Sequence, residues 1–302
     1  MKTICKNLRM LTAPNSGPMT FSGTNTYILG SGSDLCIIDP GPNDRQHYNK
    51  LLNLLKVETP SHILVTHSHL DHSESAKGLA QDFSIPILAH GKLADARSKF
   101  MKEILKNSKD IGGLEGLDQD FSPDYYVSDG EILEGNGWTI EILYTPGHLS
   151  DHLCFVYKEE DILFSGDLVM GWTSTLISPP DGDVGHYYSS LDKLLNRSEE
   201  TYLPGHGEEI KNARAYVERL KKHRLAREDQ ILTALAMGDA SSLQIAYNLY
   251  QKLPEPIIRA GTRNVLAHLI NLLERNLVTC AQPISPEALF SLRASKNHLD
   301  GS

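Results

Sequence analysis

The chain has 302 residues, of which 40% are hydrophobic and 22% charged, and its formal net charge is −9. This length and composition are typical of a soluble globular protein with one or two domains and a sizeable core. The sequence contains nothing close to the roughly 18 consecutive apolar residues of a membrane span, so no membrane association is expected. Its N-terminus mixes basic and polar residues without an apolar run, so we expect no secretory signal.

The cysteines indicate a reducing compartment. Cys5, Cys36, Cys154 and Cys280 lie far apart and form no Cys-x-x-Cys pair. Cys36 and Cys154 fall inside apolar, strand-like runs, where a buried free thiol is the ordinary interpretation. The sequence therefore predicts a cytoplasmic protein without a thiolate zinc site.

The first third of the chain alternates strands and helices. A hairpin is expected from the strands 23–29 and 35–39, because a Gly/Ser/Asp turn separates them. Apolar spacing predicts a helix over 47–55, and an apolar β-branched run predicts a strand over 62–66. Ser73 is a candidate N-cap for the next helix. The remaining expected elements are a helix over 73–83, a strand over 84–89 and a helix over 93–107.

Two long loops and a change of pattern mark the rest of the chain. The loops cover 108–122 and 171–188, and long ordered loops are often lids or binding loops. Strands mixed with helices on this scale indicate packed α and β layers. The strands are expected at 125–127, 139–143, 154–157, 162–165 and 200–203. The helices are expected at 189–195, 211–237, 242–253 and 258–276, followed by an extended 277–280.

The three last helices and the extended segment predict a small helix-turn-helix or winged-helix domain. We therefore expect a first domain over 1–215 and a second over 216–302. The first carries 18 basic and 30 acidic groups, net −12, and the second 11 basic and 8 acidic groups, net +3. Such charge asymmetry bears on partners and says little about fold.

The stretch Thr66–His72 holds three histidines and an aspartate directly after an apolar strand. If the backbone stays extended there, His67, His69 and Asp71 project to one side. Imidazole nitrogen and carboxylate oxygen are ligands of Zn²⁺. Three later strands or turns each end in a glycine next to one more such ligand. These ligands are His148, Asp167 and His206.

This set of motifs resembles the metallo-β-lactamase-fold hydrolases, and among them the group of β-lactamase-like protein 2 and its bacterial relatives. Gly23–Tyr27, Thr145–His152 and the helical extension after His206 add to the likeness. The resemblance implies an α+β fold: an αβ/βα sandwich with the metals at one edge, followed by a small winged-helix-like C-terminal domain. It also implies two Zn²⁺ per chain.

The ligands implied by the resemblance form two groups. His67, His69 and His148 hold one ion. Asp71, His72 and His206 hold the second, and Asp167 lies between the two. A hydroxide clamped by two such ions is a nucleophile at neutral pH, and the net positive centre favours negative charge developing on oxygen. Hydrolysis fits this centre and hydride transfer does not.

Several other side chains are candidates with a simpler alternative. His152 is predicted, with Asp71, as a catalytic group, or else it is a polar residue at a strand start. His186 is a candidate substrate-binding residue, or a surface residue of the long loop. Lys222 and Arg224 lie in the basic run Arg219–Arg227, which either contacts an anionic substrate or is a solvated helix face. Glu74 either lies in a first helical turn or narrows the pocket.

The sequence therefore predicts a dinuclear zinc hydrolase acting on an ester, thioester or lactone carbonyl. The alternative within this class is an endoribonuclease that cleaves single-stranded RNA. The expected partner is a small-molecule or short anionic substrate. A DNA-binding regulator with a sensor domain is the alternative of another class. Binding of duplex DNA is not expected, because the helix over 242–253 carries Lys252 as its one basic residue.

Overall fold

The computed structural model describes residues 1–108 and 111–294, which form two compact units. The first unit consists of Met1–Arg97, Leu114–Thr175 and Gly185–Lys221. The second consists of Ser98–Gly113, Leu176–Val184 and Lys222–Ser302. Two segments that the sequence analysis placed in the first domain, 98–113 and 176–184, thus belong to the second unit.

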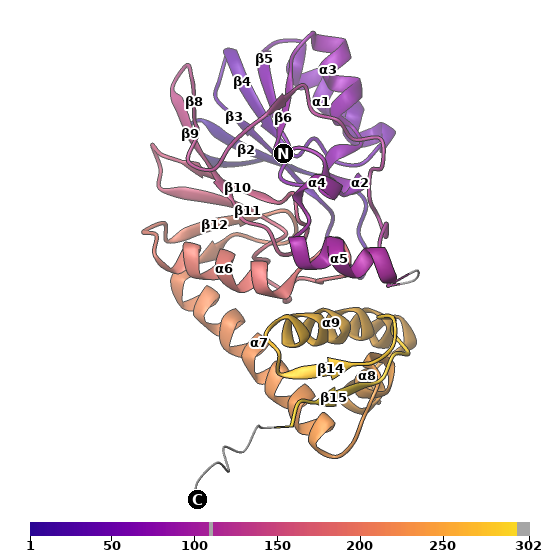
Figure 1. Cartoon of the computed structure of the whole chain (residues 1–302). Coiled ribbons are helices and arrows are strands. Elements are labelled where there is room, and N and C mark those ends of the chain that lie inside the picture. Colours follow the sequence, from indigo (N-terminus) through magenta and orange to yellow (C-terminus); the bar gives the residue numbers. More distant parts are fainter. Residues whose placement is uncertain (109–110, 295–302) are drawn as a thin grey trace, which may run out of the picture. The chain divides into compact units, whose positions relative to one another are not determined.

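Two sheets build the first unit (Figure 1). The seven-stranded sheet has the order β1 to β7, antiparallel from β1 to β4 and parallel from β4 to β7. Its strands are Lys2–Cys5, Leu8–Thr12, Asn25–Leu29, Ser33–Ile38, Thr59–Leu64, Ile87–Ala89 and Tyr125–Tyr126. The six-stranded sheet has the order β13-β12-β11-β10-β9-β8, and only its β11–β12 pair is parallel. From β8 to β13 the strands are Ile132–Gly135, Trp138–Tyr144, Leu153–Tyr157, Ile162–Gly166, Thr201–Pro204 and Ile210–Lys211.

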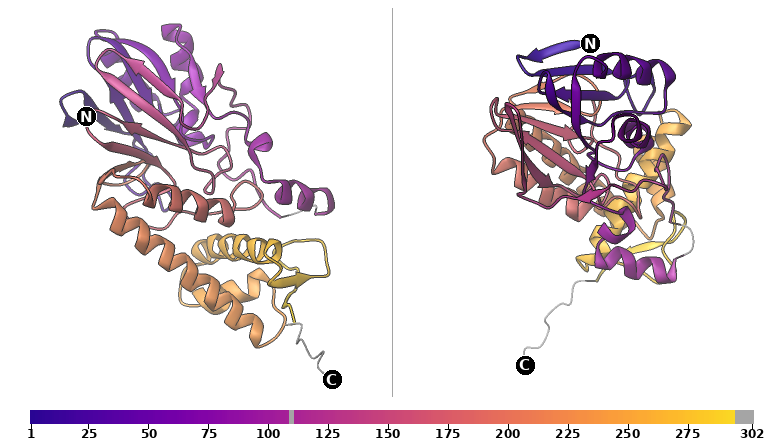
Figure 2. Two further views of the ribbon diagram at one scale, coloured as in Figure 1. Left: turned by 60° about the vertical axis from the view of Figure 1, so that its left-hand side comes forward. Right: turned by 90° about the horizontal axis from the view of Figure 1, so that it is seen from above.

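The alternation of side chains along the strands divides the core between the two faces of the seven-stranded sheet. Tyr27 and Leu29 point into the space between the sheets, where they join Phe155 and Phe164 of the opposite sheet. Ile28 points the other way, into a second apolar cluster with α1 (Arg45–Leu55) and α3 (Ala76–Phe83). Figures 1 and 2 show these helices on the outer side of that sheet. The predicted packing of α and β layers is therefore confirmed.

Two predicted helices in this part of the chain need correction. The helix expected over 73–83 is two helices, α2 (Leu70–Ser73) and α3, so Ser73 ends one helix and does not cap the next. The helix expected over 93–107 is interrupted at Arg97, between α4 (Leu93–Ala96) and α5 (Lys99–Asn107). The second break follows from Ser98, whose side chain accepts a hydrogen bond from Met101 N and starts a new helix.

The second unit holds α5, most of α7 (Ala213–Ala236), α8 (Ser242–Tyr250) and α9 (Glu255–Glu274), with a hairpin of β14 (Val278–Cys280) and β15 (Phe290–Leu292). The helices α7, α8 and α9 agree with predicted ones to within a few residues, whereas β15 was not predicted. A capping box between Ser241 and Gln244 starts α8. The unit has its own apolar core, which includes Met101, Ile231 and Phe290. Among the described residues no helix is long and apolar enough to span a membrane.

Candidate metal centre

The histidine motif follows strand β5, where the chain leaves the seven-stranded sheet. His67 and His69 lie on the short irregular segment beyond the strand, and α2 begins one residue after His69. Asp71 is therefore a helical residue, which corrects the expectation of an extended backbone at that position. Two backbone hydrogen bonds with residues 116 and 118 hold this segment: Leu70 N donates to Gly116 O (2.8 Å) and Asp118 N donates to Ser68 O (2.9 Å).

The other ligands come from the ends of strands in the six-stranded sheet. His148 follows β9, Asp167 follows β11 and His206 follows β12. Because β11 and β12 are parallel neighbours, their ends meet at one edge of the sheet. Gly205 makes room there: a Cβ atom at this position would lie 2.5 Å from both Asp167 Oδ1 and His72 Cε1. Only glycine therefore fits between these two side chains.

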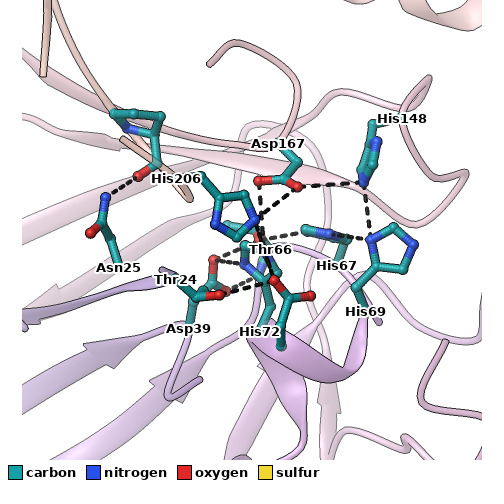
Figure 3. Close-up of polar contacts among 12 residues, drawn as sticks. Thr24, Asn25, Asp39, Thr66, His67, His69, His72, His148, Asp167 and His206 are labelled. Carbon is teal, nitrogen blue, oxygen red and sulfur yellow. Dashed lines mark hydrogen bonds and ion pairs between the residues drawn. The ribbon is translucent and has the colours of Figure 1, made fainter. Parts of the chain in front are cut away.

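The first group of side chains is His67, His69, His148 and Asp167. His69 Nδ1 lies 3.0 Å from His67 Nε2 and 3.1 Å from His148 Nε2. Asp167 Oδ2 lies 3.7 Å from His148 Nε2. One donor atom from each of the four falls within 4.8 Å of the others. Figure 3 shows the three rings converging on one region.

The second group is Asp71, His72 and His206. The Nε2 atoms of the two histidines lie 3.3 Å apart, and Asp71 Oδ2 lies 3.3 Å from His206 Nε2. Asp167 also reaches this group, with Oδ1 3.5 Å from His72 Nε2 and Oδ2 3.3 Å from His206 Nε2. Asp167 thus lies between the two groups, as Figure 3 shows.

The orientation of the rings tests whether these groups suit a metal. In four of the five histidines Nδ1 contacts a neighbouring protein oxygen: Thr66 Oγ1 for His67, Asp39 for His72, Thr175 Oγ1 for His148 and Gly23 O for His206. Nε2 of each then points at the other rings. Buried Asp167 Oδ1 also lacks a hydrogen-bond donor among the described residues. In a metal site, one nitrogen of each imidazole faces the ion, and a hydrogen bond on the other nitrogen fixes the orientation of the ring. These residues therefore fit metal ions.

Two imidazoles of the first group, His67 and His69, are held in the neutral state. Burial lowers the pKa of His69 to about 3, and the neighbouring His148 adds to this effect. Burial and His72 likewise lower the pKa of His67 well below its ordinary value. Both imidazoles are therefore uncharged at neutral pH, which is the state that donates a lone pair to a metal.

The second group attracts positive charge. Burial opposes charge on His72 and His206, but Asp71 and Asp167 outweigh it and raise their pKa values to about 9 and about 11. In return, the two histidines hold the pKa of Asp71 and Asp167 below the usual range, although burial acts in the opposite direction. In this protein-only arrangement, protons on the histidines balance the carboxylates. A divalent cation would meet the same demand.

Asp39 is a supporting residue that the sequence analysis missed. It is buried at the end of β4 and accepts hydrogen bonds from Thr66 N (2.7 Å), Thr66 Oγ1 (2.8 Å) and His72 Nδ1 (2.8 Å). Because the Thr66 hydroxyl proton goes to Asp39, Thr66 Oγ1 is left to accept from His67 Nδ1 at 2.9 Å. One carboxylate therefore fixes the tautomer of a histidine in each group.

The segment Gly23–Tyr27, noted for its family likeness, supports the other side of the centre. Thr24 Oγ1 donates to Asp71 Oδ2 (2.9 Å), and Gly23 O lies 3.2 Å from His206 Nδ1. Asn25 Nδ2 donates to Pro204 O and Gly207 O, on both sides of His206. This segment therefore holds both an acid and a histidine of the second group.

His152 lies behind the centre. Its Nε2 accepts a hydrogen bond from Asp167 N (3.1 Å), its Nδ1 lies 3.1 Å from Thr145 Oγ1, and the side chain is fully buried. Both ring nitrogens are thus engaged inside the protein. This geometry places His152 where it positions Asp167, and its predicted catalytic role stays a prediction.

The predicted substrate-binding residues lie on two helices. His186 belongs to the first turn of α6 (Val184–Leu195), so the predicted loop 171–188 ends earlier than expected. Lys222 is exposed on α7. Arg224 is buried and donates to Asn264 Oδ1 (3.0 Å) within the second unit. The basic run is therefore not one continuous solvent-facing strip, and binding of substrate by these three residues stays a prediction.

These side chains form two groups that could hold metal ions, and comparison with known proteins identifies the family. The chain belongs to the metallo-beta-lactamase superfamily, whose family model matches residues 19–206. It is 30% identical over 268 residues to a beta-lactamase-like protein 2 homolog from Caenorhabditis elegans, covering 87% of this chain and 83% of the relative. The homolog from Drosophila melanogaster is 31% identical and covers 85% of each chain. The predicted family is thus confirmed.

Other relatives and solved structures widen the comparison. An atrochrysone carboxyl ACP thioesterase from Aspergillus fumigatus is 30% identical, covering 80% of this chain and 73% of the relative. A metallo-beta-lactamase family protein from Thermus thermophilus has the same fold (TM-score 0.76, 24% identity), covering 96% of this chain and all of that one. A protein solved in a di-iron-bound form shares 25% identity (TM-score 0.51), covering 68% of this chain and 96% of its own.

Proposed function

We propose that this protein is a dinuclear zinc-dependent hydrolase that acts on an ester, thioester or lactone carbonyl. The observation that carries the proposal is the position of Asp167, whose two oxygens lie within 3.3–3.7 Å of histidines from both groups. A shared carboxylate between two sets of imidazole ligands is suited to two ions side by side. The relative in a di-iron-bound form supports the count of two.

The ligand set supports zinc. Nitrogen ligands dominate it, and the described cysteines lie outside both groups. Imidazole and carboxylate together suit Zn²⁺, although they also suit iron, as the di-iron relative illustrates. When bound, such ions would polarise the substrate oxygen and lower the pKa of coordinated water towards neutrality. The expected holders are His67, His69 and His148 for one ion, and Asp71, His72 and His206 for the other.

Asp71 is the proposed catalytic carboxylate, which orients the attacking water. Its side chain is 26% exposed, whereas that of Asp167 is 8% exposed, so solvent reaches Asp71 more easily. The Thr24 hydroxyl and His206 hold Asp71 Oδ2. The low pKa of Asp71 keeps it ionised at neutral pH, so that its carboxylate can accept a hydrogen bond from a water molecule and orient it for attack. His152 and Asp39 act behind the centre by keeping Asp167 and His72 in place.

The choice of a carbonyl substrate draws on two further facts. One relative is named as a thioesterase, which hydrolyses a carbonyl–sulfur bond. In addition, residues 1–215 carry a net charge of −12, counted as 18 basic minus 30 acidic groups, which disfavours an extended polyanion. Single-stranded RNA is the second candidate, because Lys222 is exposed on the basic helix α7. The proposed partner is thus a small-molecule or short anionic substrate.

The second unit is not a DNA-reading module in this proposal. The helices α7, α8 and α9 with the terminal hairpin favour a winged-helix-like domain. However, α8 has the sequence SLQIAYNLY, which offers no cationic side chain to base edges or phosphates. We also propose a cytoplasmic location. The four free cysteines, of which Cys36 and Cys154 are buried, support this because they suit a reducing compartment.

A substrate panel tests the proposal. Zinc-loaded protein, a chelated sample and the variant Asp167→Ala are assayed on a thioester, a lactone, a β-lactam and single-stranded RNA. We expect turnover of the thioester or lactone by the loaded protein alone. Elemental analysis should find close to two metal ions per chain in the wild type and fewer in the variant. Cleavage of RNA alone would favour the second candidate, and trace metal after reconstitution would contradict the dinuclear centre.

A further inference from the structure

Two aromatic side chains, the exposed Phe21 and the partly buried Trp172, lie beside the candidate metal ligands and take no part in the chemistry proposed above. Phe21 and Trp172 stack on each other with ring centroids 5.1 Å apart and an interplanar angle of 20°. Half of Phe21 is exposed, although it is a large apolar residue. We call these two residues the aromatic pair.

The aromatic pair is adjacent to His206 through the next residue in the chain. A Cβ atom built on Gly207 would lie 3.0 Å from Trp172 Cδ1 and 3.8 Å from Phe21 Cδ1. The backbone of Gly207 therefore runs directly against the pair. Its φ of +88° and this close approach both require glycine there. A ligand side chain of the centre and the aromatic pair are consequently neighbours.

Both aromatic residues also lie on segments that hold the centre. Phe21 precedes Gly23 and Thr24, whose contacts with His206 and Asp71 were described above. Trp172 precedes Thr175, whose hydroxyl lies 2.9 Å from His148 Nδ1. The two segments thus support different groups of ligands, and the aromatic pair is where their side chains meet.

The backbone presents Phe21 in a costly conformation. Its φ is +54°, in the left-handed region that bulky side chains rarely adopt. A tight hairpin holds it there, with Phe21 N donating to Gly17 O (2.8 Å) and Thr20 Oγ1 donating to Asn15 O (2.6 Å). Strain of this kind with half of the ring in solvent is typical of a binding position, and burial of Phe21 does not explain it.

We propose that the aromatic pair binds a planar aromatic group of the substrate, a few bonds away from the scissile carbonyl. Flat rings favour offset stacking on an exposed aromatic face, and they gain more from it than a saturated ring of equal size. Trp172 Nε1 is buried and has no hydrogen-bond acceptor among the described residues. The pair therefore presents no N–H group to solvent, and a ligand would contact it through the carbon atoms of its rings. The inference rests on the proposed carbonyl hydrolysis and adds a substrate class to it.

Matched substrates test the inference by kinetics. Zinc-loaded wild type is compared with Phe21→Ala, Phe21→Leu and Trp172→Leu on phenylacetyl and cyclohexylacetyl thioesters of N-acetylcysteamine, and on benzyl and cyclohexylmethyl acetate. We expect each variant to raise KM for the aromatic substrate, in the thioesters or in the acetates, by roughly 2- to 12-fold, the range of one aromatic contact. The saturated member should change little, and kcat should be nearly constant. Phe21→Leu keeps apolar bulk, so it separates loss of the ring from loss of packing.

Two controls make the result specific. Met19→Ala removes a neighbouring apolar side chain of similar exposure, 52% against 50% for Phe21, and should leave the aromatic preference intact. Trp172→Phe keeps a ring and should retain most of the preference. Equal ratios of aromatic to saturated KM in wild type, Phe21→Ala and Trp172→Leu would overturn the inference.

A binding experiment separates failure of the aromatic pair from failure of the proposed function. The chain has two tryptophans, and Trp138 is buried in the core. Phenylacetamide should change the tryptophan fluorescence of the chelated wild type but not that of Trp172→Phe. If this Trp172-dependent response is seen but no carbonyl substrate is hydrolysed, binding of an aromatic group by the pair is supported and the proposed function is contradicted. A stronger Trp172-dependent response to oligoadenylate than to phenylacetamide would overturn the inference in favour of a nucleobase.

Discussion

Replacing Asp39 by asparagine tests the tautomer argument in both groups of ligands. The change keeps the size of the side chain but replaces one accepting oxygen by an NH₂ donor. If the amide oxygen stays on Thr66 N, the new NH₂ faces Thr66 Oγ1 and His72 Nδ1, which lie 2.8 Å from the present Oδ2. His72 must then accept through Nδ1, which places its proton on Nε2.

The expected loss follows from the number of disturbed ligands. With a proton on Nε2, His72 cannot donate a lone pair from that atom to a metal ion. In addition, Thr66 Oγ1 no longer has to accept a hydrogen bond from His67 Nδ1, so the tautomer of His67 is no longer fixed. Outer partners of metal ligands typically contribute a factor of about 10–100 in metal affinity. Because Asp39 serves one histidine in each group, we expect the upper part of this range. That corresponds to about 2–2.7 kcal/mol of binding free energy.

The assay is a competition of zinc between the protein and a chromophoric chelator, for wild type and Asp39→Asn. Asp44→Asn is the matched control, since Asp44 is a partly buried N-cap of α1 outside both groups of ligands and asparagine caps helices equally well. We expect the control to bind zinc like the wild type. An Asp39→Asn variant with unchanged affinity and folded structure would refute the reasoning.

Three further predictions concern the surroundings of the centre and the second unit. Thr175→Val should lower zinc affinity about tenfold with little loss of stability, because His148 loses its outer partner, and the same competition assay measures it. His152→Phe should cost about 1–3 kcal/mol in denaturant unfolding, because the buried Asp167 N–H loses its acceptor, and His152→Gln should recover part of this. Burial, with Arg224 adding to it, holds the pKa of His268 in the folded protein well below its ordinary value. As the pH falls, this imidazole therefore takes up a proton more readily in the unfolded chain than in the folded protein. Stability should then fall by up to about 1.4 kcal/mol for each pH unit below about 6.5, and unfolding curves at several pH values should show a smaller slope for His268→Leu.

The ligands were predictable because their signals are local. Each of His148, Asp167 and His206 follows an apolar strand and a glycine, so a short window of sequence indicates both the element and its end. The parallel pairing of β11 and β12 then brings two of these ends together. The family and the sandwich fold followed from the same motifs.

The supporting residues were not predictable in this way, because their meaning depends on pairing between distant segments. Asp39 looks like a strand stop before Pro40, and only the pairing of β4 with β5 brings it to Thr66. Thr175 looks like one polar residue of a loop until it meets His148. Likewise, a basic run cannot show that Arg224 is buried while Lys222 is exposed, since this depends on how α9 packs on α7.

The contacts of Asn25 bear on how the chain matures during synthesis. Its side-chain amide needs acceptors that lie 179 and 182 residues further along the chain, at Pro204 and Gly207. Contacts this distant in sequence form late, because a long loop must close before they stabilise anything. On the ribosome, all strands of the seven-stranded sheet are therefore synthesised well before β12 of the other sheet, which carries Pro204. The nascent chain consequently carries its histidine motif without a complete centre until His206 has been added.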